Sequence, residues 1–417
     1  MLALTNGKLV TISSGVIEKG TVLIKEGKIE ALGKGIQIPA GARIIDVSGK
    51  VIMPGLIDAS TSVGLREDGN GPIGHDESEV NTPVAAHLRA IDAIWPEDLA
   101  LADAVAAGIT TLGAGPGNAG IINGQCAIIK TRGKTVEEMV VREPSALKVS
   151  LSGTSFMALL MQMWGGNKVQ PRDRSTDIVV FQSVLQKTRE ELDKMKRKMA
   201  EKADKAKAED KGDAPDENKG AGGDMKPDRH LQGEIIAKIL NGELPVFITA
   251  HQNHDIMNAL EIADEWGIKI VLEGGSEAHL IVEELAQRDI PVVHGPLVVN
   301  KRFDTEKMWA KTPGILQRAG LKVALTSGHP ANPVAHLRIQ AALAARDGMS
   351  KEEALRTITL TPAEILGIAD RVGSIEVGKD ADLVVLSGDL LRTATKVERV
   401  FIGGELAYEL EGGDCQC

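Results

Sequence analysis

The segment Val51-Ile52-Met53-Pro54-Gly55-Leu56-Ile57-Asp58-Ala59-Ser60-Thr61-Ser62 decides the fold, because it joins two kinds of sequence. Before it, residues 1–50 contain short runs with alternating apolar positions, such as 8–12 and 21–25, separated by turn pairs such as Glu26-Gly27. After it, short apolar strands alternate with helical stretches, a pattern typical of β-α units around a parallel sheet. The segment therefore leads from a β region into the first strand of an α/β domain.

The middle of the chain contains eight such strands, with helices between several of them. Helical periodicity predicts helices over 96–107, 254–266, 277–288 and 335–347. Eight strands indicate a (β/α)8 TIM-like barrel, whose functional residues follow the carboxyl ends of the strands. The predicted strands are 56–60, 109–113, 125–130, 147–151, 245–249, 268–273, 290–294 and 321–326.

Short β-strand patterns like those of residues 1–50 occur again near the end of the chain, at 373–376, 381–386 and 397–402. Two β segments at opposite ends of a chain usually close into one module. We therefore predict an α/β protein with two domains. Residues 1–54 and 370–410 form a small composite β-sandwich domain, 55–369 form the barrel, and 411–417 form a tail.

An insert at 181–228 interrupts the barrel pattern. Its first part, 181–206, has helical periodicity and should form a long helix. Residues 210–228 are rich in Gly, Pro, Asp, Glu and Lys, so we expect a disordered, charged loop that proteases cut first. The apolar stripe of the helix consists of Phe181, Leu185, Leu192, Met195, Met199 and Ala203.

Composition excludes several classes of protein. The 417 residues carry 48 Lys and Arg against 58 Asp and Glu, a net charge of -10, and aromatic residues are 2% of the chain. We therefore expect no nucleic-acid partner, which would require clustered cations or stacking rings. Neither a signal peptide nor an apolar run long enough for a membrane span is evident, so we expect no membrane partner and a cytoplasmic location. Cys126, Cys415 and Cys417 are too few for a disulfide framework.

Four motifs together resemble the amidohydrolase superfamily, and the imidazolonepropionase-like amidohydrolases most of all. They are the segment 51–62 quoted above, Gly108-Ile109-Thr110-Thr111, Thr361-Pro362-Ala363-Glu364-Ile365-Leu366-Gly367, and the run 373–383 beginning Gly373-Ser374-Ile375. The resemblance covers nearly the whole chain apart from the insert. It implies a barrel in which one or two divalent metals activate water to hydrolyse a C-N bond.

The same resemblance implies that the metal-ligand positions have been replaced. The first-strand histidines fall on Ser60 and Ser62, the fifth-strand histidine on Thr249, the sixth-strand histidine on Gly274 and the eighth-strand aspartate on Gly328. A fourth-strand acidic position falls on Gly153. Hydroxyls are poor zinc ligands and glycine has no side chain, so no metal cofactor is expected. Restoring histidine at 60, 62, 249 and 274 and aspartate at 328 should recover some metal affinity if the old geometry remains.

Three histidines near the predicted strand ends leave alternatives open. His251, His294 and His329 could hydrogen-bond the barrel mouth without chemistry, form a relocated site for zinc or another divalent metal, or act as a metal-free acid-base set. Asp58 is a further catalytic candidate, although a hydrogen-bonded core carboxylate is the simpler interpretation.

The leading hypothesis is a non-hydrolytic pseudoenzyme or assembly subunit. The alternative is a hydrolase acting on non-peptide C-N bonds of cyclic or linear amides, with a rebuilt active site. Because closely related scaffolds share self-complementary surfaces, we expect a homo-oligomer, a dimer or larger, or a hetero-oligomer with an active amidohydrolase paralogue.

Overall fold

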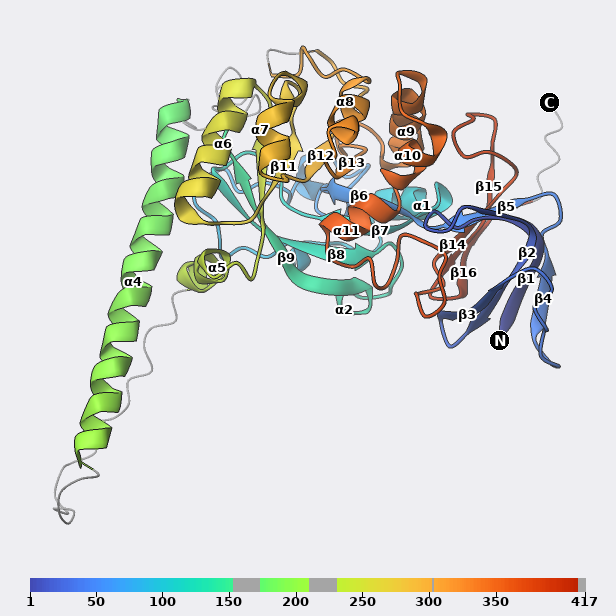
Figure 1. The fold of residues 1–417 in the computed structure, drawn as a ribbon, viewed down its shortest axis with the longest axis horizontal. Helices are drawn as coiled ribbons and strands as arrows, with labels where there is room; N and C mark the ends of the chain where they lie inside the picture. Colours follow the sequence, from blue (N-terminus) through green and yellow to red (C-terminus); the bar gives the residue numbers. More distant parts are fainter. Residues whose placement is uncertain (153–172, 210–230, 302–303, 412–417) are drawn as a thin grey trace.

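Two eight-stranded sheets organise the molecule. The computed structural model describes residues 1–152, 173–209, 231–301 and 304–411. One sheet curves into a nearly closed barrel, and the other forms a separate sheet domain beside it (Figure 1). The chain is therefore an α/β protein with a barrel and a β domain. The loop predicted at 210–228 and most of the predicted tail lie outside the described residues.

The barrel sheet has the order β13-β12-β11-β10-β9-β8-β7-β6. All eight strands predicted from the sequence are present, with most ends shifted by one to three residues, but the strand predicted at 147–151 begins seven residues earlier, at Val140. Across the gap between the first and last strands, the Thr326 hydroxyl donates to the Ser60 carbonyl at 2.6 Å. The strands are β6 (Leu56–Thr61), β7 (Ile109–Ala114), β8 (Ile122–Lys130), β9 (Val140–Ser150), β10 (Val246–Ala250), β11 (Ile270–Gly274), β12 (Val292–His294) and β13 (Val323–Leu325).

The third strand departs from the expected β-α pattern. β8 pairs antiparallel with both β7 and β9, whereas the other neighbouring strands of the barrel pair in parallel. The link from β7 to β8 spans residues 115–121 and contains no helix. A parallel connection needs a crossover of about a dozen residues or more, so this short link reverses the chain instead.

The second sheet draws its strands from both ends of the chain. Its order is β16-β15-β14-β5-β1-β2-β3, and β4 also pairs with β1. β5 and β14 pair antiparallel, and this contact joins the two chain ends. The strands are β1 (Leu2–Val10), β2 (Val16–Lys25), β3 (Lys28–Gly33), β4 (Arg43–Asp46), β5 (Val51–Pro54), β14 (Leu383–Leu386), β15 (Val397–Ile402) and β16 (Glu405–Glu409).

Helices cover the outside of the barrel. The predicted helix over 277–288 is broken into a 3-10 turn, Ala278–Leu280, and the short helix α7. The helices are α1 (Leu99–Ala106), α2 (Val136–Met139), α4 (Arg174–Glu209), α5 (Leu231–Leu240), α6 (Asn253–Trp266), α7 (Val282–Gln287), α8 (Thr312–Arg318), α9 (Leu337–Arg346), α10 (Lys351–Arg356) and α11 (Leu360–Ile365). Three further 3-10 turns are Gly71–Gly74, Ala90–Asp92 and Val334–His336. No helix in the described ranges combines the length and apolar character that crossing a bilayer requires.

Alternation along the strands divides the barrel core into two parts. On β9, Leu147 and Val149 pack outward against the helices, whereas Ala146 belongs to the apolar cluster inside the barrel. Because successive strand residues point to opposite faces, Lys148 points inward. The barrel interior away from the carboxyl ends of the strands is filled by apolar side chains such as Ile57, Phe247 and Val293. The polar side chains that point inward therefore lie near the carboxyl ends of the strands.

Candidate functional site at the barrel mouth

Four polar side chains converge near the carboxyl ends of the barrel strands, which we call the barrel mouth. Ser60 comes from β6, Lys148 from β9, Thr249 from β10 and Glu273 from β11. In the sheet register, Thr249 lies beside Glu273 on one side and Ser150 on the other. We call Ser60, Lys148, Thr249 and Glu273 the mouth cluster.

An ion pair between Lys148 and Glu273 forms the centre of this cluster. Lys148 Nζ contacts Glu273 Oε2 directly, and the two side chains are 5% and 13% exposed. Lys148 also donates to Ser60 Oγ at 3.2 Å, and Ser60 donates to Glu273 Oε1 at 2.8 Å. The Thr249 hydroxyl lies 3.0 Å from both Glu273 Oε2 and Asn118 Oδ1.

The electrostatics of the pair favour its charged form. Burial alone would raise the pKa of Glu273. The charge of Lys148 and the hydrogen bonds from Lys148, Ser60 and Thr249 outweigh burial, and the pKa of Glu273 lies below its usual value. The carboxylate is therefore an ionised acceptor that is already neutralised by a cation of the same chain.

Asp58 lies below the cluster as a wholly buried carboxyl. Its Oδ2 accepts from the Ser327 backbone at 3.0 Å and the Ser327 hydroxyl at 2.5 Å, so it ties the first strand to the segment after the last. Burial raises the pKa of Asp58, and the hydrogen bonds from Ser327 and Thr326 oppose that shift. These contacts hold the first strand of the barrel to the segment that follows the last strand.

The remaining expected metal positions offer no metal-binding donor. Ser62 is buried, and its hydroxyl donates to the Gly115 carbonyl at 3.0 Å. Gly274 and Gly328 have φ angles of +85° and +72°, in the left-handed region that side chains rarely adopt. A Cβ added to Gly274 would lie 2.5 Å from His251 Cε1, so the His251 ring occupies the space of a side chain at 274.

The structure brings together two of the three candidate histidines and places the third elsewhere. His251 lies against Gly274, and His294 lies beside Gly274 in the pairing of β11 with β12. His329 is on the side of the first strand, where its Nε2 lies 3.2 Å from the Arg66 carbonyl oxygen. The three rings are therefore not assembled into one set.

His294 is buried as a neutral ring. Burial lowers its pKa to about 3, a backbone contact with Gly274 opposes this shift, and His251 and His279 add to it. Such a ring neither carries charge nor exchanges protons near neutral pH.

This burial predicts a loss of stability in mild acid. The unfolded chain binds a proton at His294 near pH 6.5, whereas the folded chain does not until about pH 3. Stability is therefore full above pH 6.5 and should fall by about 1.4 kcal/mol per pH unit below it. Urea unfolding at pH 7, 6 and 5 measures this slope. His294→Leu should reduce the slope, whereas replacement of the exposed His336 by Gln should leave it unchanged; equal slopes in all three proteins would contradict the prediction.

The mouth cluster does not fit a zinc or manganese centre. A catalytic zinc needs about three imidazole, thiolate or carboxylate ligands. The mouth supplies one carboxylate, which Lys148 already contacts, together with hydroxyls. Across the described ranges, no group of three or more His, Cys, Asp or Glu side chains is arranged to hold a metal ion. Gly153, Cys415 and Cys417 lie outside the described residues.

Cys126, on β8, is a titratable residue that is affected by the charges of Lys148 and Glu273 in the mouth cluster. Burial raises the pKa of its thiol to about 12, with the charge of Lys148 lowering it and that of Glu273 raising it. The thiol is therefore protonated at neutral pH and is a poor nucleophile.

Lys148 and Glu273 are the functional residues that the sequence analysis missed. Each is a charged residue in a largely apolar predicted strand: Lys148 is the one charge in 147–151, and Glu273 ends 268–273, which also contains Lys269. A charge at such a position is rare unless it has a partner, and this was the available signal.

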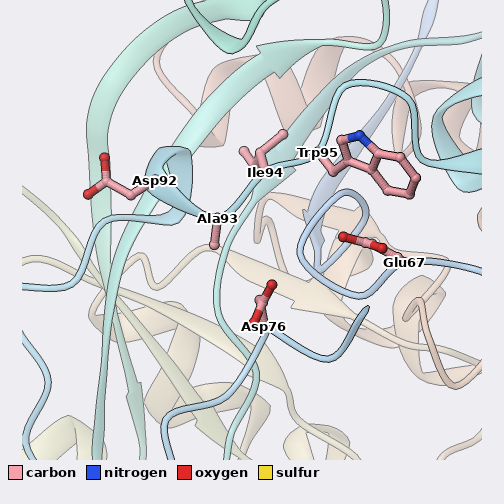
Figure 2. Close-up of a pocket in the computed structure, with 6 residues that line it drawn as sticks. All are labelled: Glu67, Asp76, Asp92, Ala93, Ile94 and Trp95. Atoms are coloured by element: carbon pink, nitrogen blue, oxygen red, sulfur yellow. The ribbon is translucent and has the colours of Figure 1, made fainter. Parts of the chain in front are cut away.

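A separate surface pocket lies away from the mouth cluster. It is lined by Glu67, Asp76, Asp92, Ala93, Ile94 and Trp95. Figure 2 shows Glu67 beneath Trp95 on one side of the pocket, Asp92 on the opposite side, and Asp76 between them below Ala93. None of the sequence-predicted site residues belongs to it, so it does not change the assignment of the candidate site.

Comparison with known proteins places this architecture in a family. The model of the amidohydrolase family matches residues 182–407. The crystal structure of an amidohydrolase from Thermotoga maritima MSB8 is 33% identical, with a TM-score of 0.84, and the match covers 98% of this chain and 100% of that one. A prolidase complexed with n-methylphosphonate-l-proline shares the fold at 17% identity and a TM-score of 0.57, over 98% of this chain and 100% of that one.

A curated relative extends well beyond the matched region. Amidohydrolase tasK of Hapsidospora irregularis is 24% identical over 405 residues, which are 94% of this chain and 40% of that protein. The chain thus spans less than half the length of tasK. The family model covers more than half of the chain, and the Thermotoga protein matches nearly all of it. On these grounds the chain belongs to the amidohydrolase family.

Proposed function

We propose that this protein is a non-hydrolytic member of its family, a pseudoenzyme that serves as an assembly subunit, and that its barrel mouth is maintained without metal. The observation that carries the proposal is the Lys148–Glu273 ion pair in the mouth cluster. A divalent cation at Glu273 would face the Lys148 ammonium at close range, and like charges repel strongly where water is excluded. The four sequence motifs at 51–62, 108–111, 361–367 and 373–383 favour the imidazolonepropionase-like branch as its origin.

The other polar groups support the same function. The hydroxyls of Ser60 and Thr249 donate to the Glu273 carboxylate of the ion pair, and the Ser62 hydroxyl donates to a backbone carbonyl. His251, His294 and His329 do not converge on a common point, which disfavours the rebuilt hydrolytic site. The scaffold would then act through its surface, as a homo-oligomer or in a complex with an active amidohydrolase paralogue.

Metal content tests the proposal directly. Protein purified without chelator and incubated with zinc and manganese should retain well under one equivalent of either after desalting, measured by elemental analysis. A variant with Cys415→Ser and Cys417→Ser removes metal that the tail could bind. One equivalent of metal that survives in this variant and is lost with Glu273→Gln would refute the metal-free mouth.

Activity provides an independent measurement. The same preparation should show no turnover above buffer on a panel of cyclic amides, acyl-amino acids and dipeptides, with or without added metal. Turnover that disappears in Lys148→Met or Glu273→Gln would establish a catalytic mouth and overturn the proposal.

A further inference from the structure

An irregular segment joins β12 to α8 on the mouth side of the barrel. Residues 295–311 run from the carboxyl end of β12 to the start of α8, and the described part of this link contains no helix or strand. We call its last part, residues 304–311, the arm. Because the arm has no ladder of backbone hydrogen bonds, its side-chain contacts decide whether it stays in place.

Three contacts join the arm to the turn at residues 276–279, and we call them the clasp. They follow one another in the same order along both segments. The pairs are Ser276 with Asp304, Glu277 with Lys307, and His279 with Trp309. The ion pair between Glu277 and Lys307 measures 2.7 Å, and the ring centres of His279 and Trp309 lie 4.5 Å apart.

His279 is the member of the clasp that can change its charge in mild acid. Its Nδ1 lies 3.3 Å from the Thr312 hydroxyl. Its Nε2 is buried and has no hydrogen-bond partner within the described residues. A second proton on the ring would therefore place a charged donor in a buried position without an acceptor. Burial is the largest reason that the pKa of His279 lies below its usual value of 6.5.

The charges that face His279 also oppose a positive ring. Lys311 and Lys307 on the arm both lower the pKa of His279. Glu277, on the same turn as His279, raises this pKa, but its carboxylate is already paired with Lys307. On the barrel side lies His294, whose own pKa is lowered by the charge of His279. Two cations and one neutralised carboxylate thus surround the ring.

The indole of Trp309 cannot compensate a charge on His279, because it already holds a cation. Lys311 Nζ lies 4.5 Å from the centre of the Trp309 ring. A protonated His279 stacked on the same indole would compete with Lys311 for the ring and repel it. The stack is therefore most favourable when His279 is neutral.

We propose that the clasp is acid-sensitive: in mild acid His279 takes up a proton, and the arm detaches from residues 276–279 while the barrel stays folded. The released His279 ring is solvated and binds a proton near pH 6.5, whereas the clasped ring resists it. Protonation therefore stabilises the released state. The clasp is fully effective above about pH 6.5 and weakens as the pH falls below that value. This inference goes beyond the proposed function and does not depend on it.

Hydrogen exchange of the full-length protein, followed by mass spectrometry, tests the release. After correction for the intrinsic exchange rate, the arm amides should be less protected than those of β11 at both pH 7.5 and pH 5.5. Their protection should fall between these pH values by up to about 10-fold, the limit for one proton that binds near pH 6.5. An arm as protected as β11 at both pH values opens only when the whole protein unfolds, and that result would overturn the inference.

Two substitutions at position 279 separate charge from packing. His279→Phe keeps a ring on Trp309 but binds no proton, so the pH-dependent loss of arm protection should disappear. His279→Lys carries a charge at both pH values, so its arm should be poorly protected already at pH 7.5. His336→Phe is the matched control, because His336 is exposed and should leave the parent's pH response unchanged. A parental pH response in His279→Phe, or parental protection in His279→Lys at pH 7.5, would contradict the role of His279.

Discussion

Lys148→Met should destabilise the protein by about 3–5 kcal/mol, because it leaves the Glu273 carboxylate buried without its cation. Both side chains are nearly buried, at 5% and 13% exposure, so water cannot replace the lost partner. Glu273→Gln should cost a similar amount by leaving the ammonium unpaired. The double variant, Lys148→Met with Glu273→Gln, should be more stable than either single variant. In it no charge remains, and the amide introduced at position 273 still accepts from Ser60 or from Thr249 through its one oxygen, because these hydroxyls bond to different oxygens of Glu273.

The pH dependence of Lys148→Met identifies the cause. Burial is the largest single influence on the pKa of Glu273 and raises it, so loss of Lys148 should raise this pKa, with only the Ser60 and Thr249 hydrogen bonds left to oppose burial. The penalty should then be largest at pH 8 and smaller at pH 5, where the carboxyl can bind a proton. Urea unfolding of all four proteins at both pH values gives the coupling energy. Lys351→Met is the control, because Lys351 forms an exposed ion pair with Asp389 at 3.0 Å and should lose less than about 1 kcal/mol. Additive single-variant effects would mean that the mouth ion pair has no net coupling.

The strands could be predicted because their signal is local. Each barrel strand is a short apolar run bounded by turns, and burial on both faces maintains that pattern. The direction of β8 was wrong because the sequence analysis counted strands without testing the length of residues 115–121 against the needs of a parallel crossover. The helix predicted over 277–288 breaks at Ile281, whose φ of -129° and ψ of 34° lie outside the helical region.

The mouth cluster was less predictable than the fold. Alternation could have placed Lys148 and Glu273 inside the barrel, but not shown that they meet across an intervening strand, β10. The family resemblance directed attention to positions 60, 62, 249, 274 and 328, and Ser60 and Thr249 do contact the ion pair. The backbone angles of Gly274 and Gly328 carry no signal in a single sequence, because glycine also occurs in ordinary turns.

Those backbone angles change what restoration of metal ligands should achieve. A Cβ added to Gly328 would lie 2.5 Å from Pro296 Cδ and 2.6 Å from Pro296 Cγ. The proline ring cannot rotate away, and the φ of +72° is unfavourable for any side chain. At Gly274 the blocking group is the His251 ring, which can move. The eighth-strand position is therefore the more difficult of the two to restore.

Gly328→Asp should lower the free energy of unfolding by about 2–5 kcal/mol, the sum of left-handed backbone strain and a steric clash in a packed site. The variant should not bind a stoichiometric amount of zinc. Gly328→Ala should retain most of this cost because the clash begins at Cβ. Gly320→Ala separates the two contributions: Gly320 has a φ of +90° with nothing within 4 Å of an added Cβ, so strain alone should cost about 1–2 kcal/mol. Urea unfolding of the three variants measures the difference. If Gly328→Ala is as stable as Gly320→Ala, Pro296 has moved, and the aspartate position is still available to a metal centre.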